Sequence, residues 1–297
     1  MALKIIKAEQ PIEVKNLTIC LYAQPGIGKT STAFTADKPL LFDFDKGAHR
    51  SNNRKDSVEI DSWSDVINIT EDDLKPYNTI IVDAVGRALD VLTVHLMKTD
   101  PKLKNRNGSF TLQGYGVLKN VFTDWLKLMR SFGKDVVLVA HMSEEKNGDD
   151  TVERLDIQGG SKNEIYKVAD VMGRLKFSGN DKRVIDFNPS ASGFGKNPTQ
   201  LPVKEVPSFK DSPTFLGDLI DEIKNKLNES LIAYNAKQEK LSQLEADLMT
   251  IDGIDAFNEQ LMIMADSSPI EKQLLLKVGK KKGFSFNKEL KVFEVVA

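Results

Sequence analysis

The sequence is poor in metal-binding and disulfide-forming residues. It has a single cysteine, Cys20, and three histidines, His49, His95 and His141, in 297 residues. One cysteine excludes an intrachain disulfide and a cysteine-rich zinc site, and it is typical of a chain in a reducing compartment. The histidines are too far apart in the sequence to show the short spacing of metal ligands.

The sequence also has no strong charge of one sign and no long apolar run. Its 41 basic and 43 acidic residues give a net charge of −2, so any nucleic-acid contact must come from a local patch. No apolar run approaches the roughly 20 residues that cross a membrane. Residues 1–15 are mixed polar and charged, unlike a signal peptide. We therefore expect a cytoplasmic protein with no membrane partner.

The most informative motif is a glycine-containing turn that follows the apolar run 17–22. Its residues are Ala23, Gln24, Pro25, Gly26, Ile27, Gly28, Lys29, Thr30 and Ser31. Glycines let backbone N–H groups approach phosphate oxygens, and the following helix N-terminus adds partial positive charge. In such a phosphate-binding loop, Lys29 reaches the outer phosphates and the Thr30 hydroxyl holds Mg²⁺. The motif predicts ATP and Mg²⁺ as cofactors, although Ala23 stands where the pattern has glycine.

Carboxylates for the metal and for catalysis follow two apolar runs. Asp83 ends the expected strand 79–83 and is predicted to hold the metal through water. Ala84 follows it, where many motor-type NTPases have the glutamate that activates water, so the base must come from elsewhere. Asp45, at the carboxyl end of the strand 40–44, is the first candidate and Asp43 the second. Alternatively, both aspartates only cap the turn before Gly47.

One histidine has a position that suits nucleotide sensing. His141 ends the apolar strand 136–141, so its ring is predicted to lie at the same sheet edge as the phosphate loop. It would sense the γ-phosphate and pass the signal to the following loop. A hydrogen-bonded structural histidine is the alternative.

Strand-like and helix-like segments alternate through the first two thirds of the chain, which predicts an α/β fold with a mostly parallel sheet covered by helices. The helices are expected at 28–36, 63–69, 86–97 and 115–132, and further strands at 151–157, 171–177 and 183–187. We expect an ATPase core over residues 1–205, a linker with a long helix or helical hairpin over 206–250, and a small α+β module over 251–297. Apolar or aromatic residues recur every seven positions in the helical part, at Ile220, Leu227, Tyr234, Leu241 and Leu248. This seam suits packing within the chain and self-association about equally.

The order of these parts resembles the RecA-type ATPase core. It is most similar to the short phage-encoded RecA-like ATPases, or phage nucleotide-binding proteins, linked to single-strand annealing and recombination. The resemblance covers about 16–202 and uses the phosphate loop, Asp43 to Ala48, Asp83, His141, Gly159-Gly160 and Lys167 to Leu175. It implies a homo-oligomeric ATPase on single-stranded DNA in the host cytoplasm, with nucleotide between subunits. A neighbouring subunit would contribute a cation, for which Lys196 matches best and Arg174 second; an exposed turn lysine is the alternative for Lys196.

Two loops would then face DNA. The first, 98–108, is followed by Phe110, which is predicted to stack on a base. Its basic residues are Lys98, Lys102, Lys104 and Arg106. The second, 142–160, is mainly acidic and is expected to repel a phosphate backbone. A C-terminal substitute is a set of lysines interleaved with Phe284 and Phe286, which also suits a replication or single-strand-binding partner. These lysines are Lys277, Lys280, Lys281, Lys282, Lys288 and Lys291. Solvated basic surfaces are the alternative in both places.

Two other functions remain open. The first is an AAA+ type remodeller or helicase loader, against which Ala84 and the lack of any arginine after Arg183 both argue. The second is a non-enzymatic, nucleotide-gated binding module, which the acidic second loop and the uncertain base would suit.

Overall fold

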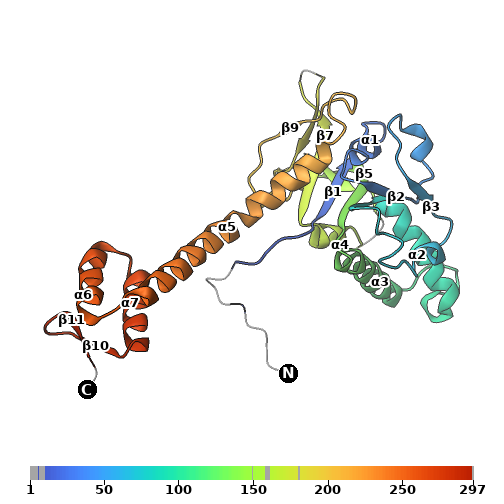
Figure 1. Cartoon of the computed structure of the whole chain (residues 1–297). Coiled ribbons are helices and arrows are strands. Elements are labelled where there is room, and N and C mark those ends of the chain that lie inside the picture. The colour runs from blue at the N-terminus through green and yellow to red at the C-terminus, as the bar shows by residue number, and fades with distance from the viewer. Residues whose placement is uncertain (1–5, 7–10, 149, 158–160, 180, 296–297) are drawn as a thin grey trace. The chain divides into compact units, whose positions relative to one another are not determined.

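The computed structural model describes residue 6 and residues 11–148, 150–157, 161–179 and 181–295 (Figure 1). It contains two compact units, an N-terminal unit over Val14–Leu227 and a C-terminal unit from Asn228 onward. The predicted residues Gly159 and Gly160 lie outside the described part of the chain. No helix among the described residues is long and apolar enough to cross a membrane.

The N-terminal unit is built on a mixed sheet with the strand order β3-β2-β4-β5-β1-β7-β8-β9. The bounds are β1 Thr18–Ala23, β2 Pro39–Asp43, β3 Ser57–Glu59, β4 Thr79–Asp83, β5 Asp135–Asn147, β6 Asp150–Leu155, β7 Val171–Phe177, β8 Arg183–Asp186 and β9 Lys204–Glu205. The strands from β3 to β7 along this order pair in parallel, and β8 and β9 add antiparallel pairs. The predicted α/β fold with a mostly parallel central sheet is confirmed.

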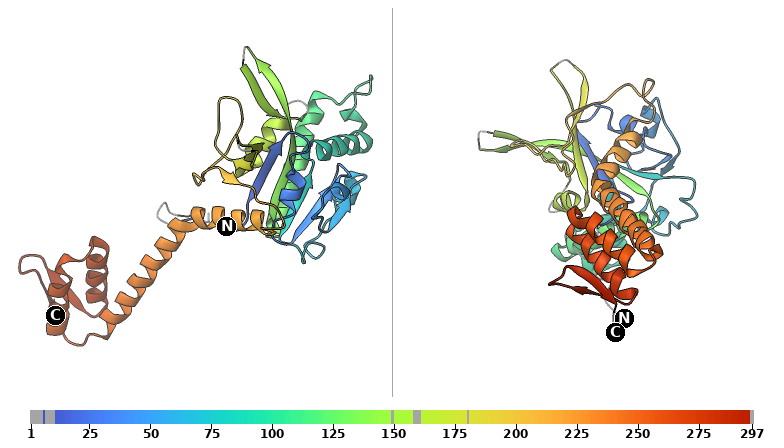
Figure 2. Two further views of the ribbon diagram at one scale, coloured as in Figure 1. Left: turned by 90° about the horizontal axis from the view of Figure 1, so that it is seen from above. Right: turned by 60° about the vertical axis from the view of Figure 1, so that its left-hand side comes forward.

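Helices cover both faces of this sheet, which explains the continuously apolar central strands. The helices of the unit are α1 Lys29–Ala33, α2 Val85–Thr99, α3 Leu112–Ser131, α4 Ser161–Val168 and the start of α5 Phe215–Thr250. Residues of α2 and α3, such as Leu92 and Phe122, share one core cluster. Phe34, which follows α1, and Ile220 of α5 belong to the cluster on the other face. Figure 2 shows the helices on the two sides of the strands.

The helix expected over residues 63–69 is wrong, because only the 3₁₀ turn η2 Trp63–Asp65 forms. Ser62 and Asp65 cap this turn with reciprocal hydrogen bonds. The carbonyl of Val66 then accepts a hydrogen bond from the Trp125 indole at 3.1 Å, so a tertiary contact uses an acceptor that a longer helix would need. The other 3₁₀ turns are η1 Ala48–Arg50, η3 Pro101–Leu103 and η4 Met264–Asp266.

The second DNA loop expected over residues 142–160 is also wrong in its described part, which forms an antiparallel hairpin. β5 continues past His141 to Asn147 and pairs with β6. Met142 lies opposite Leu155, and Val152, across from Glu145, is buried. The acidic residues therefore occupy positions in a two-stranded ribbon, drawn in light green in Figure 2. Met142 and Leu155, which lie opposite each other at the base of the ribbon, pack on the core cluster of α2 and α3 and anchor this charged segment.

The C-terminal unit has a small core of its own. It contains the rest of α5, followed by α6 Ile254–Ile263, α7 Pro269–Lys281, β10 Phe284–Asn287 and β11 Val292–Val295. The predicted cap of α7 is confirmed, since Ser268 and Glu271 form a capping box. Phe284 and Phe286 pack against the core residues Phe257 and Phe293. Both rings are only partly buried there, so their predicted contact with DNA stays a prediction.

Candidate nucleotide site

The phosphate loop connects β1 to α1 and has the backbone conformation that its glycines allow. Gly26 and Gly28 have φ angles of 81° and 92°, a region that side chains with a Cβ rarely adopt. The Lys29 side chain is almost completely buried, and its amine donates to the carbonyls of Ala23 at 3.1 Å and Gln24 at 2.9 Å. Burial lowers the pKa of this amine, while Asp83 and Asp45 oppose that shift. The loop thus holds a desolvated cation beside its backbone amides.

The proposed metal ligands meet at the carboxyl end of the sheet. The Thr30 hydroxyl donates to Oδ2 of Asp83 at 2.5 Å. Asp83 is 8% exposed, and burial raises the pKa of its carboxyl to about 6, although Thr30 and Lys29 oppose that shift. Mg²⁺ prefers oxygen ligands and is usually held by one or two protein groups, phosphates and water. A hydroxyl and a carboxylate in contact therefore fit this ion.

A cavity of about 330 Å³ brings most of the predicted site together. Its lining residues are Pro25, Gly26, Gly28, Lys29, Thr30, Ser31, Asp45, Gly47, Arg50, Ser51, Asp83 and His141. Three loop residues lie outside this lining. Ala23 is buried at the end of β1, Gln24 donates to Glu144 at 3.0 Å, and Ile27 packs on the core.

The two candidate base residues have different surroundings. Asp43 is buried, and its oxygens accept hydrogen bonds from the backbone amides of Gly47 at 3.0 Å and Ala48 at 2.8 Å. It therefore has the turn-capping geometry that was the alternative interpretation. Asp45 lines the cavity, and Arg50 lies 3.0 Å from its carboxylate. Of the two, only Asp45 lines the nucleotide cavity.

His141 lies beside the phosphate loop, because β5 pairs with β1 and places His141 opposite Ala23. Its Nδ1 atom is buried without a hydrogen-bond partner among the described residues. Burial lowers the pKa of the ring, and the nearby Lys29 lowers it further. A neutral ring with an unpaired nitrogen in the cavity wall is suited to a hydrogen bond with a ligand.

Arginines complete the site and were missed in the sequence. Arg50 lines the cavity, and Arg87 lies 3.8 Å from Asp45 and 3.4 Å from Asp90. The signal for Arg87 was its position in α2, directly after the strand that ends at the proposed metal ligand Asp83. A second cavity of about 190 Å³ contains Arg87 and shares Asp45 and His141 with the nucleotide cavity.

The two cations expected to act on a neighbouring subunit lie outside the lining of this cavity. Arg174 forms ion pairs with Glu153 and, at 3.8 Å, with Asp186, so its charge is already compensated. The amine of Lys196 donates to the carbonyl of Ala169 at 2.5 Å. That carbonyl precedes β7 and lies near the amino end of the strand, whereas the phosphate loop follows the carboxyl end of β1.

The first predicted DNA segment is folded. Leu103 is buried, and Lys104 forms an isolated antiparallel β-bridge with Phe110, so backbone pairing closes the turn between them. Phe110 is half-buried against Tyr115, and both line a groove of about 360 Å³ together with Gly108 and Ser109. This groove shares Gly86, Asp90 and Ile157 with the second cavity described above.

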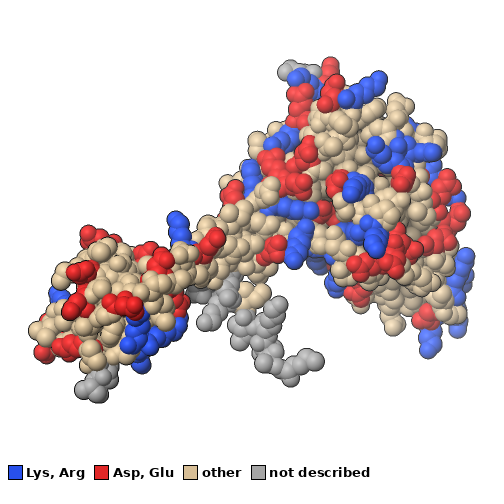
Figure 3. All heavy atoms as spheres, in the orientation of Figure 1, with Lys and Arg blue, Asp and Glu red and all other residues tan. Residues whose placement is uncertain are grey.

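The predicted C-terminal lysines are only partly free. Lys277 and Lys281 pair with Glu245, and Lys282 donates to the carbonyl of Met249. The side-chain amine of Lys280 has no partner among the described residues. Figure 3 shows basic and acidic side chains mixed over the visible face, as the small net charge predicts.

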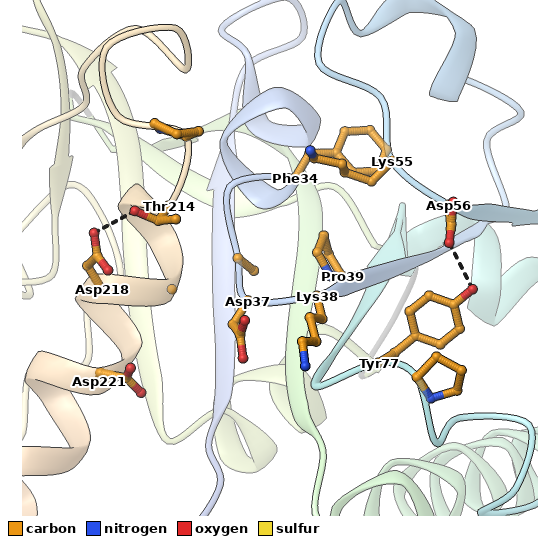
Figure 4. Close-up of a pocket in the computed structure, with 14 residues that line it drawn as sticks. Phe34, Asp37, Lys38, Pro39, Lys55, Asp56, Tyr77, Thr214, Asp218 and Asp221 are labelled. Carbon is orange, nitrogen blue, oxygen red and sulfur yellow. Dashed lines mark hydrogen bonds between the residues drawn. The ribbon is translucent and has the colours of Figure 1, made fainter.

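A larger cavity, of about 580 Å³, lies at the opposite edge of the sheet (Figure 4). It includes Pro39 at the start of β2 and Asp218 and Asp221 of α5. Asp56 accepts a hydrogen bond from Tyr77, and Asp218 accepts one from Thr214. None of the residues of the phosphate loop lines it, so it is separate from the nucleotide site.

Comparisons with known proteins identify the family. A family model described as "AAA domain" matches residues 15–199, and the chain therefore belongs to this family (AAA_24) of P-loop proteins. A solved structure titled a KaiC-like protein, PH0186, from the archaeon Pyrococcus horikoshii OT3, is similar at 10% identity with a TM-score of 0.36. The similarity covers 69% of this chain and 100% of that one. A search of curated proteins finds no match.

Proposed function

We propose that the protein is a Mg²⁺-dependent ATPase that acts on single-stranded DNA in phage recombination, annealing or replication. One observation carries the ATPase part of the proposal. The loop glycines, Lys29, Thr30, Asp83 and Asp45 all line one cavity at the carboxyl edge of a parallel sheet. These are the groups that a phosphate chain, a metal ion and an attacking water require.

Each residue has a task in this proposal. The backbone amides of the loop bind the phosphates, and Lys29 exchanges its contacts with the Ala23 and Gln24 carbonyls for phosphate oxygens. Thr30 and Asp83 hold Mg²⁺, which neutralises charge on the phosphates when bound. Asp45 accepts the proton of the attacking water. The unpaired Nδ1 of His141 forms a hydrogen bond with the terminal phosphate or its attacking water and so senses its presence.

The DNA part of the proposal is supported by the groove beside Phe110. Aromatic and apolar side chains that line it include Phe110, Tyr115, Val94 and Met97, and such surfaces accept bases without sequence preference. The adjoining segment carries exposed basic residues for the backbone, namely Lys98, Lys102, Lys104 and Arg106. The groove shares Asp90 with the second cavity, and that cavity shares Asp45 and His141 with the nucleotide cavity. Bound DNA would influence turnover through these shared residues.

The proposal includes a homo-oligomer with nucleotide between subunits. Lys196 is exposed in the isolated chain, as a cation supplied to a neighbour must be, although its amine contacts Ala169. Arg174 is a weaker candidate because two carboxylates already neutralise it. The C-terminal unit, with Lys280, Lys281 and Lys282, is then available for DNA or for a replication partner.

The experiment is to measure the ATPase rate and the particle size with and without single-stranded DNA, with Lys29→Ala as the inactive control. We expect a DNA-stimulated rate and larger particles. Tight ATP binding with no turnover under either condition would contradict the ATPase and favour a nucleotide-gated binding module. Turnover that does not respond to DNA would remove the DNA role and leave the ATPase.

An ATP-driven remodeller is the second candidate, because the family description is "AAA domain". Ala84 after the metal-binding Asp83 still argues against it. Stimulation of turnover by a protein substrate, and not by single-stranded DNA, would favour this function over the first.

A further inference from the structure

Arg183 begins β8 and lies directly over the phosphate loop. A methyl group built on the Cα of Gly28 would be 2.5 Å from Nη1 of Arg183 and 3.8 Å from its Cζ. The guanidinium therefore lies next to the Cα of Gly28, in the space that a side chain there would occupy. Arg183 also shares a small hollow with Ser31 and Thr32 of the loop and the first helix.

The Arg183 guanidinium has no counter-ion in the part of the chain that the structure describes. It forms no ion pair with a described residue, and its one hydrogen bond, to the carbonyl of Pro207, is long at 3.5 Å. The other residues of the hollow are Thr35, Val206, Pro207, Phe209 and Phe215, none of which is acidic. By contrast, the preceding residue, Lys182, pairs with Glu205 at 2.8 Å. A half-buried guanidinium without a carboxylate, placed beside converging backbone amides, is suited to an anion.

The strand order determines which end of a nucleotide Arg183 would meet. Asp45 follows β2, Asp83 ends β4 and His141 lies in β5, and these strands are all on one side of β1. β8 is on the other side, beyond β7. The metal and the terminal phosphate belong to the first side, so a cation on β8 approaches the phosphate chain from the nucleoside end.

We propose that Arg183 binds the α- or β-phosphate of the nucleotide, the part common to ATP and ADP. The proposal rests on the nucleotide function proposed above and adds a ligand contact to it. Arg183 is a binding residue within its own subunit, unlike the neighbour's cation that Lys196 would supply. Because the contact excludes the terminal phosphate, it serves affinity for both substrate and product.

The test compares Mg²⁺-ATP and Mg²⁺-ADP affinities of the wild type, Arg183→Ala, Arg183→Lys and the control Lys182→Ala by calorimetric titration. A hydrogen bond to a charged group is worth 1.5–3 kcal/mol, so Arg183→Ala is expected to weaken ATP and ADP alike by about 10- to 100-fold. Arg183→Lys keeps the charge but loses the planar guanidinium. Its nucleotide affinity is expected to lie between those of the wild type and Arg183→Ala. Lys182→Ala removes only an exposed ion pair and is expected to stay within about twofold.

Two results would overturn the proposal: unchanged affinities in Arg183→Ala, or a loss confined to ATP. Thermal unfolding without nucleotide checks that each variant folds. If Arg183→Ala does not fold, wild-type affinity in a folded Arg183→Lys would count against the proposal. A wild type that binds neither nucleotide would refute the proposed function itself, which is a separate result.

Discussion

The Thr30 hydroxyl donates to the Asp83 carboxylate at 2.5 Å across 53 positions of sequence. This contact connects the first turn of α1 to the end of β4, although β5 separates β4 from β1 in the sheet. Two oxygen-bearing groups from distant segments thus meet at one point of the nucleotide cavity. A hydroxyl and a carboxylate in contact are the two protein ligands that the proposed Mg²⁺ site requires.

Removing the Thr30 hydroxyl should weaken the response to Mg²⁺. Thr30→Val keeps the side-chain shape, and we expect it to lower ATP turnover by roughly 10- to 100-fold and to raise the Mg²⁺ concentration needed for half-maximal rate. Thr32→Val is the matched control, because the Thr32 hydroxyl bonds to the Gly28 carbonyl and does not line the cavity. Equal Mg²⁺ titration curves for Thr30→Val and the wild type would contradict the assignment.

Asp83 should make the nucleotide-free protein less stable at neutral pH. Burial raises its pKa from 3.8 to about 6, so the folded protein binds this proton more tightly than the unfolded chain. The ionised carboxylate therefore costs stability above pH 6, and this cost disappears as the pH falls from 6 towards 4. Asp83→Asn should remove it, at most roughly 3 kcal/mol. Thermal unfolding with a chelator should show a variant that is more stable than the wild type at pH 7.5 and not at pH 4; a wild type that is more stable at both would contradict this.

Substitutions of Asp45 and Asp43 should have different effects, the first on ATP turnover and the second on stability. Asp45→Asn is expected to reduce turnover by roughly 100-fold or more while ATP still binds, because it removes the base. Asp43→Asn is expected to cost about 1–3 kcal/mol of stability, because the amides of Gly47 and Ala48 lose a charged acceptor. Single-turnover kinetics and chemical denaturation measure the two effects. The reverse pattern would exchange the roles of these aspartates.

The basic segment before Phe110 should determine the salt dependence of single-stranded DNA binding. Replacing Lys102, Lys104 and Arg106 by alanine removes up to three phosphate contacts. The slope of log binding constant against log salt concentration is negative, and its magnitude should decrease by about two. Replacing Lys280, Lys281 and Lys282 gives a comparison of equal charge, and the larger change identifies the main contact. Binding titrations at several salt concentrations provide both slopes. No change in either variant would remove DNA contact from both regions.

The sheet and the residues at its carboxyl edge could be predicted because their signals are local. Apolar runs that end in Asp83 or His141, and glycines at positive φ, follow from burial on both faces and from backbone sterics. The helix at 63–69 could not be excluded in this way, because the Trp125 bond to Val66 comes from a distant helix. The β5–β6 hairpin was hidden by its charge, since its three apolar residues, Met142, Val152 and Leu155, show no alternation along the strands.

The surroundings of individual side chains depend on packing between distant segments, which the sequence does not show. Phe284 and Phe286 have the composition of a DNA-binding surface, but packing against Phe257 and Phe293 leaves each ring only partly exposed. Arg183 gave no sequence signal, because it comes near Gly28 only through the pairing of β8 with β7 and of β7 with β1. Long-range strand pairing decides such contacts, whereas a motif records only neighbours in the chain.

The most direct measurement is ATP binding and turnover by the wild type and Lys29→Ala, with and without Mg²⁺. The exposed Lys38→Ala, in the cavity at the opposite edge of the sheet, is the control. We expect the wild type and Lys38→Ala to bind and hydrolyse ATP only with Mg²⁺, and Lys29→Ala to lose turnover altogether. A wild type that neither binds nor hydrolyses Mg²⁺-ATP, or a Lys29→Ala variant that turns over at the wild-type rate, would contradict the proposed nucleotide site.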